Sequence, residues 1–125
     1  MNDAAKDYTI FLDQEDGYLH VTVGGKRVTS DIALAYWREI IDKCEANNCP
    51  RILLDHDFEE MISMQEMLQV IGPVADLLKG RLLAFYDRFG NYEIPEAGKV
   101  ILRSKGIKMQ IFHHLDEAIK WLLAN

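Results

Sequence analysis

Acidic and histidine side chains end two apolar segments of the chain, and they are the residues best suited to chemistry. Asp55, His56 and Asp57 end one segment, and Asp87 ends the next. Open α/β sheets bind ligands outside the carboxyl ends of their strands, so we expect these side chains at one rim of a sheet. Carboxylates at adjacent strand ends could hold Mg²⁺ and serve phosphoryl transfer or hydrolysis.

The sequence lacks the other parts that such an enzyme needs. It has no glycine-rich phosphate loop, no lysine partnered with one and no nucleophile elbow. His113 and His114 are adjacent, so their side chains diverge, and His20 falls in an expected hairpin. We therefore favour a non-enzymatic protein without metal or cofactor, in which the acidic rim is solvated. A Mg²⁺-dependent phosphotransfer or hydrolase site is the alternative.

Ser63 is the candidate for regulation. Ser63 and Glu66 have the spacing of a capping box, in which the serine hydroxyl serves one free amide at the helix start and the glutamate reaches back to another. Capping is the favoured role. Phosphorylation stays open, because a charge of about −2 is tolerated at a helix N-terminus.

Aromatic and methionine side chains are dense around the ends of the same two segments. They are Phe58, Phe85, Tyr86, Phe89, Tyr92, Met61, Met64 and Met67. Flexible methionines suit adaptable apolar surfaces, so the group could line a cavity for an apolar or lipid-like ligand. Core packing is the favoured role, because a small domain needs its aromatic side chains to fill its interior.

Hydrophobic periodicity predicts the elements that position these residues. Strands are expected at 8–12, 19–23, 51–57, 81–87 and 107–112, and helices at 30–47, 63–80, 91–104 and 115–122. Gly24 and Gly25 are interpreted as a turn, and Ser30 as the cap of the first helix. Pro73 should kink or split the second helix.

The order ββαβαβαβα predicts an α/β fold with a single mixed sheet and helices packed on it. Strands separated by helices need crossovers, which make the later strands parallel and leave the first strand antiparallel at the edge. The length of 125 residues suits one domain over residues 1–125. The exposed edge strand at 8–12 also suggests a homodimer, because its backbone groups can pair with a second copy.

Composition narrows the classes of partner and location. The net charge of -6 opposes nucleic-acid binding, which depends on Lys and Arg that neutralise phosphates. No apolar run is long enough for stable membrane insertion, and the start MNDAAKDYTI lacks the pattern of a signal peptide. We expect a cytoplasmic protein with reduced cysteines, whose partner is an unidentified protein or a small apolar ligand.

Three stretches resemble the SpoIIAA-like group of small bacterial proteins, a STAS/SEC14-type domain family. They are GYLHVTVGGKRVTSDI before a helix that carries a tryptophan, RILLDHDF at the middle strand, and the ending FHHLDEAIKWL. The resemblance implies a STAS-like fold and a regulatory role, and its SEC14 side implies an apolar-ligand carrier. STAS-type anti-sigma factor antagonists carry a phosphorylatable serine after an aspartate; here EEMISMQEM keeps Ser63, with Ile62 in place of the aspartate.

The leading hypothesis is a non-enzymatic cytoplasmic binding or regulatory domain. Its expected binding surface consists of Asp55, His56, Asp57, Phe58, Ser63 and Asp87.

Overall fold

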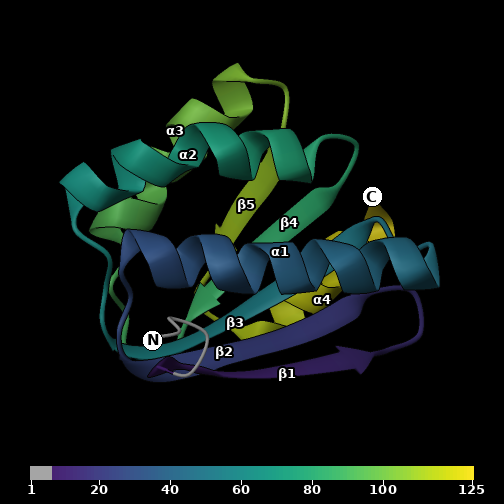
Figure 1. Cartoon of the computed structure of the whole chain (residues 1–125). Coiled ribbons are helices and arrows are strands. Elements are labelled where there is room, and N and C mark those ends of the chain that lie inside the picture. The colour runs from purple at the N-terminus through teal and green to yellow at the C-terminus, as the bar shows by residue number, and fades with distance from the viewer. Residues whose placement is uncertain (1–6) are drawn as a thin grey trace.

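A mixed sheet organises the computed structural model, which describes residues 7–125 (Figure 1). Its strands are β1 (Thr9–Gln14), β2 (Leu19–Arg27), β3 (Arg51–Glu60), β4 (Leu82–Asp87) and β5 (Lys108–Phe112). Its helices are α1 (Ser30–Asn47), α2 (Met64–Leu78), α3 (Glu93–Ser104) and α4 (Leu115–Ala124). Residues 1–6, on which part of the signal-peptide expectation rests, lie outside the described residues. No helix within residues 7–125 combines the length and hydropathy that a membrane span requires.

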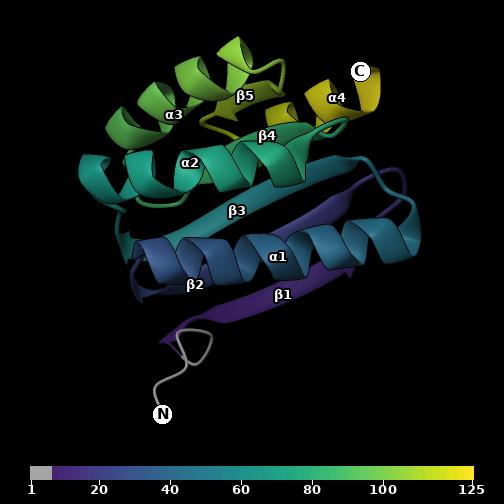
Figure 2. The same cartoon turned by 45° about the horizontal axis from the view of Figure 1, so that its top comes forward.

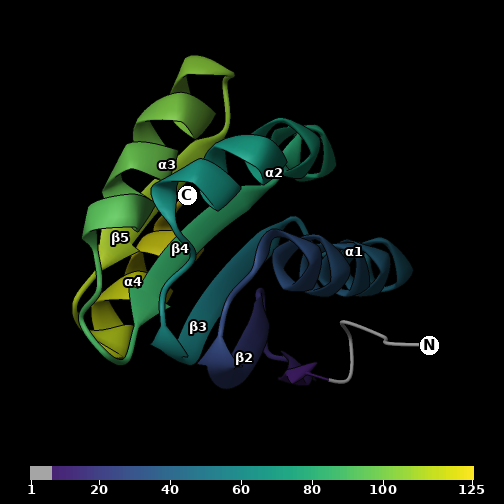
Figure 3. The same cartoon turned by 60° about the vertical axis from the view of Figure 1, so that its left-hand side comes forward.

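The strands lie in the order β1-β2-β3-β4-β5, with β1 antiparallel to β2 and the other pairs parallel. This confirms the predicted α/β fold with an antiparallel edge strand. Each parallel strand lies next to the one before it, so right-handed crossovers place α1, α2 and α3 on the same face. On that face α2 lies between α1 and α3 (Figure 2). Helix α4 follows the last strand and covers the opposite face of β3, β4 and β5 (Figure 3).

Two apolar cores result from this arrangement. The larger core lies between the sheet and α1–α3 and contains Leu19, Val21, Val23, Ile52, Leu54 and Phe58. The smaller core lies under α4 and contains Leu53, Leu82, Ala84, Ala118 and Leu122. Side chains along β3 alternate between the two cores, as expected for a strand with helices on both faces.

The predicted turn at Gly24 and Gly25 is wrong, because both residues lie inside β2. Gly24 pairs with Asp57 of β3. A Cβ atom at Gly24 would lie 2.9 Å from the carbonyl oxygen of Asp57. The glycine therefore permits a close approach of two parallel strands, and β2 continues to Arg27.

The helix starts also differ from expectation. Thr29, and not Ser30, caps α1, since its Oγ1 accepts a hydrogen bond from the amide of Ile32 at 3.2 Å. Ser63 caps α2 as predicted, accepting from the amide of Glu66 at 3.1 Å. The carboxylate of Glu66 accepts from the amide of Ser30 at 3.2 Å, so it links α2 to the start of α1 and does not complete a capping box. Helix α2 is not split at Pro73.

Candidate functional site

The end of β3 sends its polar side chains to opposite faces of the sheet. Asp55 and Asp57 lie on the α4 face, whereas His56 lies on the face of α1–α3. The strand register pairs Asp55 with Tyr86 and His56 with Asp87, so Asp87 shares a face with His56. The single rim expected from the sequence is therefore divided. Asp55 and Asp87 cannot bind one Mg²⁺ ion together, because the sheet lies between them.

On the α4 face, Asp55 is buried and bound by two basic side chains. Its carboxylate accepts hydrogen bonds from Nε and Nη2 of Arg88 at 2.9 and 3.0 Å, and it contacts Nε2 of His20 at 3.0 Å. Burial alone would raise the pKa of Asp55, but the hydrogen bonds of His20 and Arg88 outweigh it and lower this pKa. The carboxylate is thus already neutralised within the protein. Asp57 adds a longer ion pair with Arg88, at 3.8 Å.

On the other face, His56 and Asp87 form a buried pair. Nδ1 of His56 lies 2.9 Å from Oδ1 of Asp87, and the two residues are 1% and 2% exposed. The other carboxylate oxygen of Asp87 accepts from the amide of Asn91 at 2.8 Å. The imidazole packs between the rings of Phe58 and Phe85, at centroid distances of 5.0 and 5.4 Å. These contacts fix the orientation of the ring.

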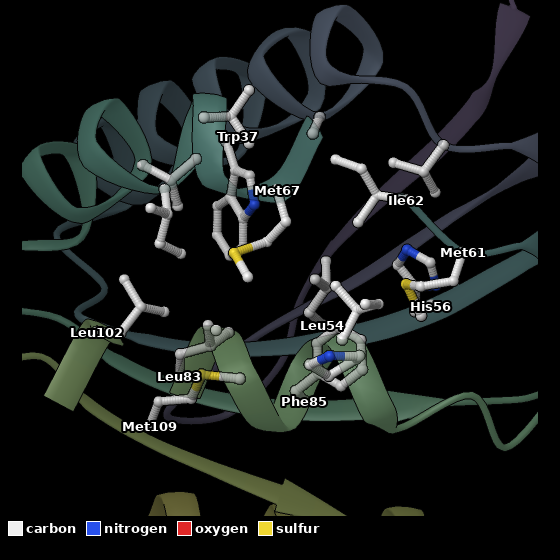
Figure 4. A pocket seen from close by; sticks show the side chains of 18 of the residues that line it. Trp37, Leu54, His56, Met61, Ile62, Met67, Leu83, Phe85, Leu102 and Met109 are labelled. Carbon is white, nitrogen blue, oxygen red and sulfur yellow. The ribbon is translucent and has the colours of Figure 1, made fainter. Parts of the chain in front are cut away.

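His56 also lines an apolar cavity beneath α2 (Figure 4). Further lining residues include Trp37, Leu54, Met61, Met67, Leu83 and Met109. The cavity has a volume of about 100 Å³, whereas a cavity that binds benzene has roughly 150 Å³. A lipid-like ligand has no room in this cavity as the structure stands.

Only part of the predicted aromatic and methionine group reaches this cavity. Phe85, Met61 and Met67 line it. Phe58 is fully buried in the larger core, whereas Met64 and Phe89 are exposed. The favoured interpretation, core packing, thus holds for Phe58 and not for Met64 and Phe89.

Ser63 lies at the surface, next to an uncharged strip of α2. Its hydroxyl accepts from the amide of Glu66 and lies 3.2 Å from Oε1 of the same residue. The exposed residues of α2 between Ser63 and Asp76 are Met64, Gln65, Leu68, Gln69 and Pro73. We call these five residues the uncharged face of α2. Met64 and Leu68 are neighbours on the helix and are 41% and 54% exposed.

Two residues of the site were missed in the sequence. Arg88 follows Asp87 at the end of β4 and donates a hydrogen bond to Asp55. The only signal in the sequence was the general rule that a buried carboxylate needs a cation beside it. His20 was placed in the expected hairpin without a partner, but its Nε2 lies 3.0 Å from Oδ2 of Asp55 on the neighbouring strand. Among residues 7–125, no group of three or more His, Cys, Asp or Glu side chains is placed to hold a metal ion.

Comparison with known proteins gives a likeness in fold to solved structures. No family model matches the chain, and no curated protein matches it. Among solved structures, the chain is similar to the crystal structure of an anti-sigma factor antagonist from Mycobacterium paratuberculosis, with a TM-score of 0.63 and 19% sequence identity. The likeness covers 93% of this chain and 94% of that one. The chain therefore has the SpoIIAA/STAS-type fold, as the sequence resemblance implied.

Proposed function

We propose that this chain is a non-enzymatic, cytoplasmic regulatory domain that binds a protein partner through the uncharged face of α2 and the adjoining Ser63. The observation that carries the proposal is the composition of that face, in a chain of which 27% of the residues are charged. Protein interfaces are depleted of charged residues at their centre and enriched in methionine. The likeness in fold to an anti-sigma factor antagonist supports the same class of function.

The position of Ser63 offers a means to regulate this binding. A phosphate on Ser63 would meet the positive end of the α2 dipole, which favours it. It would also lie beside the carboxylate of Glu66, which now contacts the hydroxyl, and like charges at that distance repel. Glu66 in turn holds Ser30 and Arg27. Modification at Ser63 would therefore disturb the contact between the starts of α1 and α2 at the edge of the binding face.

The proposal is tested with a charge placed on the face and a matched charge elsewhere. Leu68→Glu introduces a carboxylate on the uncharged face, and Val100→Glu introduces one on α3, where Val100 is 67% exposed. Each tagged full-length variant is cross-linked in its native cells, and the captured proteins are quantified by mass spectrometry. We expect a protein that is captured by the wild type and Val100→Glu and lost from Leu68→Glu.

The captured protein is then purified and titrated against the same three chains. A carboxylate desolvated without a partner costs several kcal/mol, so Leu68→Glu should weaken binding at least about thirtyfold. Equal capture and equal affinity for both variants would rule out the uncharged face as the binding surface.

A further inference from the structure

We propose that the cavity beneath α2 is a binding site for a small, mostly apolar molecule with one hydroxyl group, which donates a hydrogen bond to Nε2 of His56. The site is separate from the proposed partner surface. It lies on the inner side of α2, whereas the uncharged face lies on the outer side.

The hydrogen bonding of His56 selects the polar group of the ligand. Nδ1 is hydrogen-bonded to Asp87, and among residues 7–125 this is the only hydrogen bond of the imidazole. The Asp87 carboxylate also accepts the amide of Asn91, so it acts as an acceptor on both oxygens. When Nδ1 carries the proton that Asp87 accepts, Nε2 of the neutral ring is itself an acceptor. A hydroxyl donor is the complementary group.

A hydroxyl group in the cavity would give Nε2 of His56 a hydrogen-bond partner. The residue is 1% exposed, and it lines a cavity whose walls are otherwise mostly aliphatic, aromatic and sulfur side chains. Nε2 has no hydrogen bond within residues 7–125, yet it is not among the fully buried side-chain atoms without a partner, so it keeps surface that a small polar group can reach. A hydroxyl group brought by an apolar molecule restores one hydrogen bond and fills apolar space at the same time.

The size and flexibility of the cavity select the rest of the ligand. At about 100 Å³ it is smaller than the cavities of roughly 150 Å³ that bind benzene. Met61, Met67 and Met109 line it, and methionine side chains change conformation easily. The cavity can therefore adapt to a single ring or a short branched chain. Phenol, which has one ring and one hydroxyl, is the simplest probe of this class.

The test compares phenol with toluene, which has a similar size and no hydroxyl. Each is titrated into the full-length chain with methyl-labelled methionine and ¹⁵N-labelled histidine, and binding is followed by NMR. We expect both probes to shift the Met67 and Met109 methyl signals. Phenol should bind about tenfold more tightly, as one added hydrogen bond allows, and it alone should shift Nε2 of His56.

A cavity-filling variant locates the site without removing His56 or Asp87. A Cβ at Gly98 would lie 3.9 Å from Ile71 and 4.0 Å from Met67, which is ordinary contact distance within the cavity wall. Gly98→Leu should therefore occupy the cavity and abolish phenol binding. Val100→Leu, on the exposed side of α3, is the control that should bind phenol like the wild type.

Three results would overturn the proposal. Absence of any methionine shift with either probe means that the cavity does not bind such molecules. Equal affinity for phenol and toluene, with an unmoved His56 signal, removes the role of the imidazole. Undiminished phenol binding by folded Gly98→Leu places the bound phenol elsewhere.

Discussion

Asp55 and His56 are neighbours in β3, yet the side chains that pair with them lie on opposite faces of the sheet. Asp55 is bound by Arg88, and His56 is bound by Asp87, although Asp87 and Arg88 are themselves neighbours at the end of β4. The carboxyl ends of the parallel strands β3 and β4 are thus joined by two side-chain pairs. Asp55 and Arg88 pair on one face of the sheet, and His56 and Asp87 pair on the other. This arrangement fixes the register of β3 and β4 where the loops to α2 and α3 begin.

The Asp55 pair predicts a loss of stability in acid. The folded pKa of Asp55 lies below its ordinary value of 3.8, so the unfolded chain binds the proton more tightly than the folded chain does. The stabilisation is complete above the unfolded pKa and is lost as the pH falls through the folded pKa. We expect Asp55→Asn to cost about 1.5–3 kcal/mol at pH 7 and to flatten this acid-side loss, measured by urea unfolding at a series of pH values.

Asp76→Asn is the control for this experiment. Asp76 forms an exposed ion pair with Lys79 at 3.7 Å, and exposed pairs contribute about 1 kcal/mol or less. If Asp55→Asn and wild type lost stability in parallel as the pH falls, the ion pair would not be the cause.

The His56–Asp87 pair predicts strong energetic coupling. Asp87→Ala should destabilise the chain by about 1.5–3 kcal/mol, because it leaves the buried Nδ1 of His56 without its charged acceptor. In the Asp87→Ala variant, His56→Leu should lower the free energy of unfolding much less than it does in the wild type. The interaction between the two side chains has already been lost in that variant. Urea unfolding of the two single variants and the double variant gives the coupling free energy. Strictly additive costs would show that the two side chains stabilise the fold independently.

The helices and strands could be predicted from the sequence, because their apolar residues recur at regular spacings. The run at Arg51 predicted β3, and the change of periodicity after Phe112 predicted α4. The sequence also implied that Asp55 and His56 lie on opposite faces of the sheet, since adjacent residues of a strand face opposite ways. The prediction of a single rim did not use this rule. Gly24 was misread because a glycine that ends a strand and one that admits a neighbouring strand have the same local sequence.

The rest of the site depends on contacts between distant segments. The pairing of His56 with Asp87 follows from the register of β3 and β4, which no local pattern states. Glu66 has the spacing of a capping box, but its carboxylate reaches Ser30, which comes close only when α1 and α2 pack together. The cavity is bounded by residues from three helices and three strands, so its existence could not be predicted from any one of them.

The capping role of Ser63 predicts a modest loss on removal of its hydroxyl. Ser63→Ala should cost about 1 kcal/mol of unfolding free energy, as for other N-cap serines. Ser63→Asp keeps an acceptor at the cap but places its carboxylate beside that of Glu66, so it should restore only part of that loss. Thermal unfolding of both variants measures the difference. An Ala variant as stable as the wild type would mean that solvent replaces the cap.

Edge strand β1 predicts self-association at high concentration. It pairs only with β2 among the described strands, and Phe11 is 61% exposed on the face that α4 leaves open. A second copy can add its own β1 and cover both the backbone groups and the ring. Light scattering should report a dimer as the concentration rises, and Phe11→Lys should remain monomeric. Val100→Lys, on α3, should behave like the wild type; a wild type that is monomeric throughout would contradict the prediction.

Two glycine-to-alanine substitutions should have opposite effects on stability. At Gly24 the new methyl group would lie 2.9 Å from a backbone oxygen and 3.2 Å from the Cβ of Asp57, and a strand in the sheet cannot move away without losing its own hydrogen bonds. Gly24→Ala should therefore cost about 1–3 kcal/mol. At Gly98 the methyl group meets only side-chain ends at 3.9 and 4.0 Å. Gly98→Ala should stabilise α3 by about 0.5–1 kcal/mol, because alanine loses less backbone entropy in a helix. Urea unfolding of the two variants checks both signs, and a tolerated Gly24→Ala would imply that β2 and β3 can separate at this point.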